Sequence, residues 1–209
     1  MFGAASEGEG APPLLPAEEG YAAALRSPRR QLSFRLGRWA ARRALSALGE
    51  PESVPLLPRP DGSVGWPPGV CGALSHSQGY AVAIAARTRD ACGLGIDLEL
   101  LSRVVQPEVA RRICGPHELA WVHESPLEAG LRTLTVFSAK ESVFKALGPL
   151  YGRRFGFLQA RLHPVGSDRF EAEILFYLNE RFRAGSRVPV IVTREEEFLL
   201  TYCVLPPST

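Results

Sequence analysis

The side chains best suited to chemistry lie in two short stretches, GIDLEL at 95–100 and FSAKESVFKAL at 137–147. The first stretch carries Asp97 and Glu99, and the second carries Glu141 together with the only two lysines among 24 lysines and arginines. Three carboxylates supply the oxygen ligands that Mg²⁺ prefers, and a lysine ammonium is a compact charge that suits a phosphate oxygen. These residue types predict a site for a divalent cation and a polyphosphate.

The stretch that carries both lysines, Lys140 and Lys145, has the spacing of a helix. Ser138 and Glu141 match a capping box, in which each side chain accepts a backbone N–H of the other residue. Glu141 and Lys145 are four residues apart and share one face. In an alternative interpretation, these residues only cap the helix and form a solvated ion pair worth about 0.2–0.5 kcal/mol. The apolar stripe of the helix consists of Phe137, Val143, Phe144 and Leu147.

The two acids of GIDLEL alternate with aliphatic residues, which is the period of a strand. Asp97 and Glu99 would then share one face about 6.6 Å apart and repel each other by roughly 2–3 kcal/mol at an effective dielectric of ~20. Near a core, that repulsion calls for a cation. The alternative is a water-facing edge strand, where acidic side chains are harmless and help prevent aggregation.

A basic segment at 27–48 predicts an amphipathic helix, since it begins with Ser-Pro and Gly49 follows its end. Most of its arginines would form a solvated face. Arg30 and Arg38 are eight residues apart, two turns along one face, and could together bind a phosphate.

His76 lies between Ser75 and Ser77, where a predicted strand breaks. A histidine in such a place is more often a structural hydrogen-bonding residue, and the alternative is a cation or donor for an anionic ligand. The proline-rich segment before this strand, at 50–70, is predicted to be a loop with Arg59 as its one basic residue.

The composition excludes several classes of protein. With 209 residues, 45% of them hydrophobic, the chain can build one sizeable core or two small halves that share one. A net charge of +2 does not indicate general nucleic-acid binding. No segment approaches the ~20 apolar residues of a membrane span, and no signal peptide is apparent. The four cysteines lack C-x-x-C spacing, which argues against a zinc site and predicts buried, reduced thiols in a cytoplasmic protein.

The order of predicted elements favours an α+β fold with mostly antiparallel sheet. Residues 1–20 are expected to be a flexible arm, followed by two related halves at 21–95 and 96–209. Short helices are expected at 106–114 and 116–123, with His117 and His123 on the surface. Strands are expected at 81–86, 94–100, 156–163, 170–177, 189–192 and 198–205.

Four stretches of the chain resemble one family. They are RQLSFRLGRWAARRAL at 30–45, WPPGVCGALSHS at 66–77, GIDLE at 95–99 and FSAKESVFKAL at 137–147. Together they are similar to the 4′-phosphopantetheinyl transferases of the surfactin/enterobactin-synthetase type, over roughly residues 27–160. The paired GIDxE and FSxKESxFK patterns are the most specific part. The resemblance implies a pseudo-twofold molecule built from two similar α/β halves.

By that resemblance, the protein would transfer the phosphopantetheine arm of coenzyme A to a serine of a carrier protein and release 3′,5′-ADP. Asp97, Glu99 and Glu141 would hold Mg²⁺ on the pyrophosphate. Lys145 would balance charge on the phosphate oxygens, and Lys140 would lie beside the pyrophosphate or the carrier. The adenosine end of coenzyme A, chiefly its 3′-phosphate, would be surrounded by Arg30, Arg38, Arg59, Ser75 and His76.

The chemistry expected is in-line attack of a serine hydroxyl on the β-phosphorus, with charge on the pyrophosphate stabilised by the metal and Lys145. The hydroxyl needs a base, and both Glu141 and a water held by the metal are candidates. Two positions depart from the family pattern: Arg59 stands where lysine is common, and Ala73 stands where serine is more usual.

Other functions are compatible with parts of this pattern. A non-catalytic coenzyme A or nucleotide-binding regulator would use the same phosphate contacts, and a metal-dependent phosphohydrolase would use the same carboxylates. A small trimeric acyl-carrier synthase would share the chemistry, but the length and two-part layout disfavour it. The expected partners are acyl or peptidyl carrier domains of a peptide synthetase, polyketide synthase or fatty-acid system. A monomer is expected, with no nucleic-acid or membrane partner.

Overall fold

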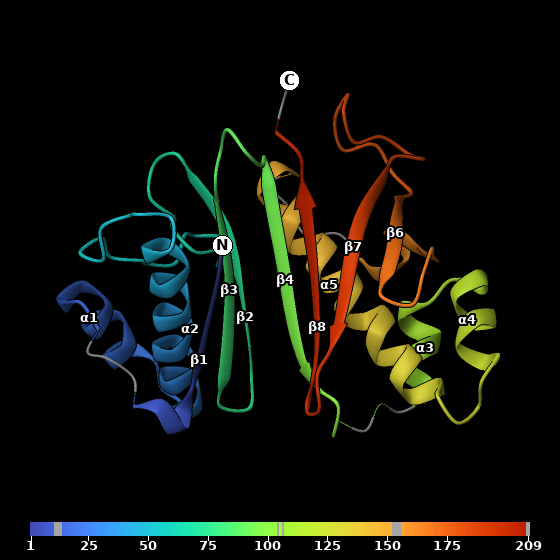
Figure 1. The fold of residues 1–209 in the computed structure, drawn as a ribbon, viewed down its shortest axis with the longest axis horizontal. Helices are drawn as coiled ribbons and strands as arrows, with labels where there is room; N and C mark the ends of the chain where they lie inside the picture. Colours follow the sequence, from blue (N-terminus) through green and yellow to red (C-terminus); the bar gives the residue numbers. More distant parts are fainter. Residues whose placement is uncertain (11–13, 104, 106, 152–155, 208–209) are drawn as a thin grey trace.

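The computed structural model describes residues 1–10, 14–103, 105, 107–151 and 156–207. Its strands form two sheets, a smaller one with the order β1-β3-β2 and a larger one with the order β4-β8-β7-β6-β5 (Figure 1). Every strand pairing within them is antiparallel, which confirms the predicted α+β class. The strands are β1 Phe2–Ser6, β2 Val70–Ser77, β3 Tyr80–Arg87, β4 Gly93–Leu100, β5 Ala160–Pro164, β6 Arg169–Ile174, β7 Arg187–Arg194 and β8 Phe198–Leu205.

Each sheet is covered by one long helix. α2 packs on β1 and β3, and α5 packs on β4 and β8 and runs behind them in Figure 1. In each half, the first strand pairs with the last strand, β1 with β3 and β4 with β8. This repeated plan gives the molecule two similar halves. The helices are α1 Pro16–Ala24, α2 Pro28–Ser46, α3 Pro107–Ile113, α4 Pro116–His123 and α5 Ala129–Tyr151, with 3₁₀ turns η1 Glu7–Glu9 and η2 Phe157–Gln159.

The sequence of α2 explains its position. Pro28 occupies the first turn, where its missing N–H costs nothing. Leu36, Ala40 and Ala44 recur at helical spacing and are buried against the small sheet. The helix predicted at 27–48 is therefore confirmed.

Two glycines allow the long helices to lie unusually close to the sheets. A Cβ atom at Gly3 of β1 would overlap the carbonyl of Ala40 in α2, and one at Gly95 of β4 would overlap the carbonyl of Ser142 in α5. Only glycine permits such an approach of two backbones. Gly95 thereby fixes the distance between the strand that carries the acids and the helix that carries the lysines.

The N-terminal segment differs from the expectation of a flexible arm over residues 1–20. Phe2–Ser6 forms β1, which pairs with residues 80–84 of β3, and Pro16 begins α1. The strand was missed because Gly3, Ala4 and Ala5 show no alternation of apolar and polar side chains. The division near residue 95 stays a prediction, and β4 begins shortly before it, at Gly93.

The helix that carries the lysines is longer than expected. It begins at Ala129, so Ser138 lies in its interior and the predicted capping box of Ser138 and Glu141 is wrong. The Ser138 hydroxyl instead shares a hydrogen bond of 3.0 Å with Thr201 Oγ1 of β8. The short helices α3 and α4 confirm the expected pair, although Gln106 lies outside the described residues.

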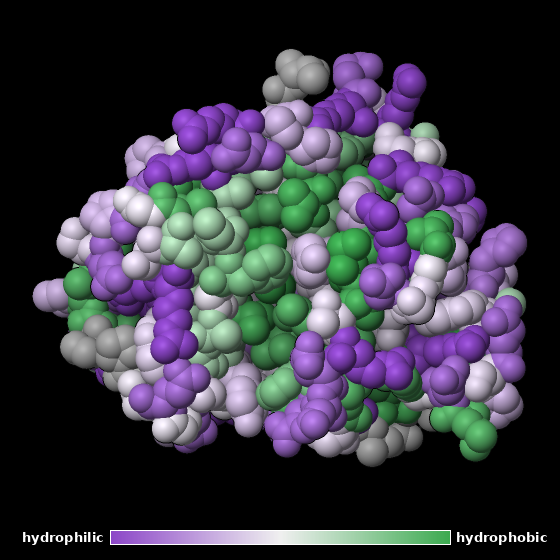
Figure 2. All heavy atoms as spheres, viewed as in Figure 1, coloured by the Kyte–Doolittle hydropathy of each residue, from purple (hydrophilic) through white to green (hydrophobic). Residues whose placement is uncertain are grey.

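The face of the sheets turned away from α5 is largely apolar. Figure 2 shows hydrophobic residues gathered in the middle of this face, over β4 and β8. The rings of Phe2 and Tyr202 meet edge to face with their centroids 5.3 Å apart, which joins β1 to β8. No helix in the described part of the chain is long and apolar enough to cross a membrane.

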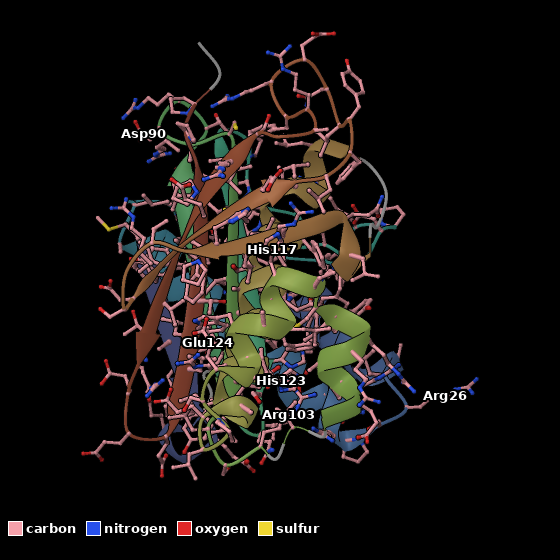
Figure 3. All side chains as sticks on the ribbon, turned by 90° about the vertical axis from the view of Figure 1, so that its right-hand side faces the viewer. Arg26, Asp90, Arg103, His117, His123 and Glu124 are labelled. Carbon is pink, nitrogen blue, oxygen red and sulfur yellow. The ribbon has the colours of Figure 1, made fainter. Side chains whose placement is uncertain are left out.

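The two histidines expected on the surface lie there, whereas only two of the four cysteines are buried as expected, Cys114 and Cys203, and Cys71 and Cys92 are half-buried. His117 and His123 are exposed on α4, which faces the viewer in Figure 3. All four cysteines are free. Burial raises the pKa of Cys114 to about 11 and that of Cys203 to about 12, so these two remain unreactive thiols.

Candidate active site

The acidic strand β4 passes through the interior of the molecule. All eight of its residues are buried, because α5 covers one face and β2 lies beside it. Asp97 is 5% exposed and Glu99 is 7% exposed. The alternative of a water-facing edge strand is therefore wrong, and each carboxylate needs a cation or a hydrogen-bond donor.

Asp97 lies where the two halves meet. Its Oδ1 accepts a hydrogen bond from Ser75 Oγ of β2 at 2.9 Å and from Lys145 Nζ of α5 at 2.8 Å. Lys145 Nζ also donates to the carbonyl of Ile96 at 3.0 Å. Asp97 Oδ2 is buried and has no hydrogen-bond partner among the described residues. The acidic strand and the lysine helix thus meet at Asp97.

Glu99 is paired with a cation that the sequence reasoning missed. Its Oε1 accepts a hydrogen bond from Arg103 at 2.7 Å, and the guanidinium lies over the Phe137 ring at 5.2 Å. Burial, and to a lesser degree the charge of Asp97, raise the pKa of Glu99, whereas the bond from Arg103 lowers it. The signal available was the spacing, since Arg103 follows Glu99 by four residues.

One cavity of about 1650 Å³ joins the two halves. Its walls come from α2, the loop before β2, the end of β2, the end of β4 and the middle of α5. Six of the residues singled out from sequence line it: Arg30, Arg38, His76, Glu99, Glu141 and Lys145. Glu141 is half-buried there. The cavity therefore brings basic side chains of the first half to the same space as acidic side chains of the second.

Arg38 is a buried cation in the wall of this cavity. It is 5% exposed, its guanidinium lies over the Phe34 ring at 4.1 Å, and its Nε has no hydrogen-bond partner in the part of the chain that the structure describes. Burial lowers the pKa of Arg38 to about 10. An anion bound in the cavity would compensate Arg38 for the hydration that it loses on burial. Arg30, two turns earlier on α2, is exposed.

His76 stands near the end of β2 and lines the same cavity. His76 is exposed as a whole, so it loses only part of its hydration; that loss lowers the pKa of His76, and the nearby charge of Lys145 lowers it further. The imidazole is therefore mainly neutral at pH 7, and it can donate one hydrogen bond to a phosphate without carrying charge.

Lys140 does not lie where the resemblance places it. It is fully buried, and its Nζ donates to the carbonyls of Ile113 at 2.7 Å and Phe157 at 2.9 Å and to a carboxylate oxygen of Glu118 at 2.9 Å. Burial lowers the pKa of Lys140, and Glu118 opposes that effect. All three protons of the ammonium are used, so Lys140 ties α3, α4 and η2 to α5 and does not line the cavity.

Three further predicted site residues, Asp97, Ser75 and Arg59, are not in the wall of the cavity. Ser75 is buried beneath it, with its hydroxyl committed to Asp97. Arg59 does not line it either, although the following turn does, through Asp61, Gly62 and Ser63. Asp61 Oδ1 accepts the backbone N–H and the hydroxyl of Ser63, which holds this turn in shape. Sequence reasoning assigned the segment only as loop, because Asp-Gly signals a turn without indicating what it faces.

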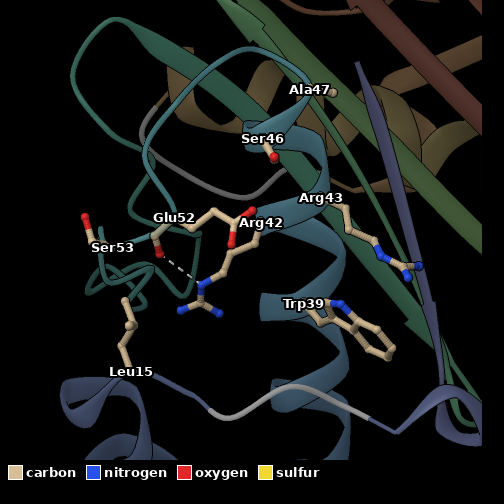
Figure 4. A pocket seen from close by; sticks show the side chains of 8 residues that line it. All are labelled: Leu15, Trp39, Arg42, Arg43, Ser46, Ala47, Glu52 and Ser53. Carbon is tan, nitrogen blue, oxygen red and sulfur yellow. Dashed lines mark hydrogen bonds between the residues drawn. The ribbon is translucent and has the colours of Figure 1, made fainter.

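A second pocket of about 850 Å³ lies on the outer side of α2 and contains none of the predicted site residues (Figure 4). Its cations are already engaged: Arg42 donates to the Glu52 carbonyl at 3.4 Å and pairs with Glu18, and Arg43 pairs with Glu9 at 3.0 Å. This pocket lacks the meeting of acids and bases found in the larger cavity.

Comparisons with known proteins agree with this geometry. The model of the 4′-phosphopantetheinyl transferase N-terminal domain matches residues 17–86, and that of the 4′-phosphopantetheinyl transferase superfamily matches residues 93–203. The second match covers more than half of the chain. This protein belongs to the 4′-phosphopantetheinyl transferase superfamily. The matches meet between β3 and β4, on the two sides of the shared cavity.

Individual phosphopantetheinyl transferases resemble the chain in part. The enzyme Svp of Streptomyces mobaraensis is 40% identical over 157 residues, which cover 71% of this chain and 61% of Svp. Npt of Nocardia iowensis is 36% identical over 148 residues, 70% of this chain and 64% of Npt. The chain thus spans somewhat over three fifths of these relatives. The holo-[acyl-carrier-protein] synthase of Thermotoga maritima has a TM-score of 0.43 at 22% identity, covering 56% of this chain and 65% of that one.

The superfamily implies a divalent cation, and the donor chemistry of this site suits one. Asp97 Oδ2 is a buried carboxylate oxygen with no partner among the described residues, and Glu99 follows on the same face of β4. Of the three acids, Glu99 and Glu141 line the cavity, and Asp97 lies behind its wall. Within the described ranges, however, no three histidine, cysteine or acidic side chains are already grouped so that they could hold a metal ion. Glu99 is instead held by Arg103. The proposed ligand set stays a prediction.

Proposed function

We propose that this protein transfers the 4′-phosphopantetheine moiety of coenzyme A to a serine of an apo carrier protein in a Mg²⁺-dependent reaction that releases 3′,5′-ADP. The observation that carries the proposal is the single cavity that Arg30 and Arg38 share with Glu99, Glu141 and Lys145. Coenzyme A carries a 3′-phosphate and a pyrophosphate, so it needs cationic side chains at the first and a set of acids that binds a cation at the second.

The basic wall would receive the adenosine end. Arg38 is buried, partly desolvated and unpaired at Nε among the described residues, which favours binding of a phosphate dianion by a charge-assisted hydrogen bond. Arg30 lies two turns away on α2 and would approach from solvent. Neutral His76 would donate a hydrogen bond from β2. These three side chains would orient the co-substrate with its pyrophosphate toward β4.

The acidic wall would be the reacting end. Asp97, Glu99 and Glu141 would hold Mg²⁺, which would neutralise charge on the pyrophosphate when bound. Lys145 is fixed between Asp97 and the Ile96 carbonyl and is part exposed to the cavity, so its ammonium would stabilise negative charge on the departing phosphate. The proton of the attacking serine would be accepted by Glu141, on the same helix face, or by a water molecule that the cation holds.

The acceptor would be an acyl or peptidyl carrier domain. The relatives include enterobactin synthase component D of Salmonella typhi, which is 37% identical over 82 residues. By this similarity, the carrier domain of a peptide synthetase is one candidate acceptor for this protein. We also propose that the protein acts as a monomer, because the two halves of one chain already enclose the cavity. Light scattering at working concentration would test this.

The decisive experiment incubates the protein with coenzyme A, Mg²⁺ and a panel of apo carriers from peptide synthetase, polyketide synthase and fatty-acid systems. Each carrier is then weighed by mass spectrometry. The expected result is the mass of one phosphopantetheine added to at least one carrier, and loss of that addition when EDTA replaces Mg²⁺.

Two results would contradict the proposal in different ways. Calorimetric binding of coenzyme A with every carrier unmodified would identify a non-catalytic coenzyme A-binding regulator. Release of 3′,5′-ADP at the same rate without any carrier would identify a phosphohydrolase. Glu171→Ala serves as the matched control. It removes a carboxylate of β6 that pairs with Arg187 and does not line the cavity, so it should retain full transfer.

A further inference from the structure

Ser75 and Asp97 form a buried contact between strands of different sheets. Ser75 belongs to β2 of the small sheet, and Asp97 belongs to β4 of the large sheet, which lies beside it. Their side chains are 7% and 5% exposed, and Ser75 Oγ donates to Asp97 Oδ1 at 2.9 Å. The two halves of the chain therefore touch through the side chain that the proposed cation site most depends on.

The two oxygens of Asp97 are in opposite situations. Oδ1 accepts hydrogen bonds from Ser75 and Lys145, whereas the buried Oδ2 accepts none from the described residues. A half-turn of the carboxylate only exchanges its two equivalent oxygens, whereas any smaller rotation would weaken both hydrogen bonds. The pair of donors therefore fixes the plane of the carboxylate and the position of its second oxygen, and a buried carboxylate oxygen without a donor is where a cation would bind.

The two donors differ in how firmly they define that orientation. Lys145 has a long side chain that is 28% exposed, and its ammonium also bonds the Ile96 carbonyl. Ser75 has one rotatable bond before its hydroxyl, and its backbone pairs with Val82 of β3. The short serine side chain therefore holds the carboxylate of Asp97 in a fixed orientation. The longer lysine side chain can still change its conformation when a ligand binds in the cavity.

We propose that Ser75 is a positioning residue, which holds Asp97 Oδ1 so that Oδ2 faces the cation, and that it does not contact the co-substrate. This inference rests on the proposed function. It departs from the role that the family resemblance implies for Ser75, because the hydroxyl is committed to Asp97 beneath the cavity wall.

The test measures Mn²⁺ binding by calorimetry to protein saturated with coenzyme A, and separately coenzyme A binding in EDTA. Ser75→Ala should weaken Mn²⁺ binding about tenfold, the lower end for loss of an outer partner of a metal ligand. Coenzyme A affinity in EDTA should not change. Ser75→Thr, which keeps the hydroxyl on a residue suited to a strand, should restore most of the Mn²⁺ affinity.

Ser142→Ala is the matched control. Its hydroxyl is also buried, but it donates to the Ala139 carbonyl within α5 at 2.7 Å, and its loss should leave Mn²⁺ binding unchanged. Should Ser75→Ala fail to fold by circular dichroism, Ser75→Cys replaces the strong donor by a weak one at similar size and should show the same direction of change.

Three results would overturn the inference. Unchanged Mn²⁺ affinity in both donor-deficient variants would show that Ser75 does not orient the ligand. Weakened coenzyme A binding in EDTA would show that Ser75 contacts the co-substrate. Absence of Mn²⁺ binding to the wild-type complex would remove the cation site. The proposed function is judged separately, by whether the wild-type protein modifies a carrier at all.

Discussion

Each half of the molecule contains an equivalent buried anchor, a glutamate that accepts two backbone N–H groups and pairs with a cation of the long helix. The halves differ in the cation that pairs with this glutamate. In the first half, Glu18 of α1 accepts the backbone N–H groups of Leu15 at 3.1 Å and Leu56 at 2.8 Å and pairs with Arg42 of α2. In the second, Glu118 of α4 repeats the pattern. It accepts the N–H groups of Gly115 at 2.7 Å and Leu162 at 2.8 Å and pairs with Lys140 of α5.

A second device is shared as well. Each first strand meets its long helix at a glycine, Gly3 or Gly95, and a helix cation then donates to the carbonyl of the next strand residue. Arg43 donates to Ala4 at 2.6 Å in the first half, and Lys145 donates to Ile96 at 3.0 Å in the second. The halves are therefore built on one plan, although their sequences show no obvious repeat.

The difference between the halves lies at the proposed reaction site. The strand residue after the carbonyl is Ala5 in β1 and Asp97 in β4. α2 has 19 residues and α5 has 23, so α5 is longer by about one turn. The contacts of Gly3 and Gly95 match Ala40 with Ser142 and Ala44 with Ala146. By this match Lys145 corresponds to Arg43, and Glu141 stands where α2 has Trp39. The comparison teaches that the same pairing of a strand with a long helix has different roles in the two halves. In the first half, β1 and α2 only support the fold, whereas in the second half β4 and α5 also carry the acids of the proposed site.

The largest effect is expected when β4 is given the residue of β1. Asp97→Ala should reduce carrier modification by about 10³-fold, since it removes both the proposed cation ligand and the partner of Lys145. Mass spectrometry of the carrier measures the loss, and circular dichroism checks that the fold is retained. Near-normal transfer would contradict both the proposed site and the functional contrast between the halves.

Removing the cation of each buried anchor should lower the free energy of unfolding by different amounts, because the two cations are buried to different degrees. Lys140→Ala leaves Glu118 as an uncompensated buried charge and should lower the free energy of unfolding by about 3–5 kcal/mol in urea titration. Arg42→Ala should cost less, because the Arg42 side chain is 11% exposed and that of Lys140 is 0% exposed. Equal losses would show that this difference in burial does not matter.

The glycine contacts give a matched pair of structural variants. Gly95→Ala and Gly3→Ala should each reduce the free energy of unfolding by about 1–3 kcal/mol, because the added methyl group meets helix backbone that cannot rotate away. Gly130→Ala, where a Cβ meets no neighbouring atom, is the control. An unchanged midpoint in thermal unfolding of the first two variants would count against the shared device.

The helix cations can be exchanged in kind. Lys145→Arg copies the residue that α2 uses at Arg43 and should leave the fold stable. It should still lower transfer roughly tenfold to hundredfold, because a guanidinium fork cannot occupy the position of an ammonium beside Asp97. Carrier modification rates measure the effect, and full activity would show that charge alone suffices there.

The smallest expected effect concerns His76. Its pKa should lie below the ordinary value of about 6.5, so the neutral form stabilises the fold above that pH and the contribution is lost as pH falls through the lowered pKa. NMR titration of the imidazole measures this. Addition of coenzyme A should raise the pKa, because a nearby phosphate favours the imidazolium, and no change would place the phosphate elsewhere.

Much of the element pattern could be predicted from local spacing. The helix at 27–48, the acidic strand and the strands at 170–177, 189–192 and 198–205 carry clear periodicity, and the structure contains that helix and strands at those places. The strand predicted at 156–163 is wrong in its first half, where Phe157–Gln159 forms η2 and β5 begins only at Ala160. β1 was missed because its small residues hide the alternation. Two related halves were predicted, but no repeat is visible in the sequence itself, because the shared pattern lies in contacts of Glu18 and Glu118 with Leu56 and Leu162, which are far away in the chain.

The sequence by itself determined the chemical inventory: three acids, two lysines, basic residues on one helix and the family to which these motifs belong. Only the tertiary structure decided their roles. It buried Lys140 against Glu118, attached Ser75 to Asp97 and paired Glu99 with Arg103. The physical reason is that the type of a charged residue does not reveal whether its side chain is solvated or buried. The partners that decide between these states come from distant segments of the chain.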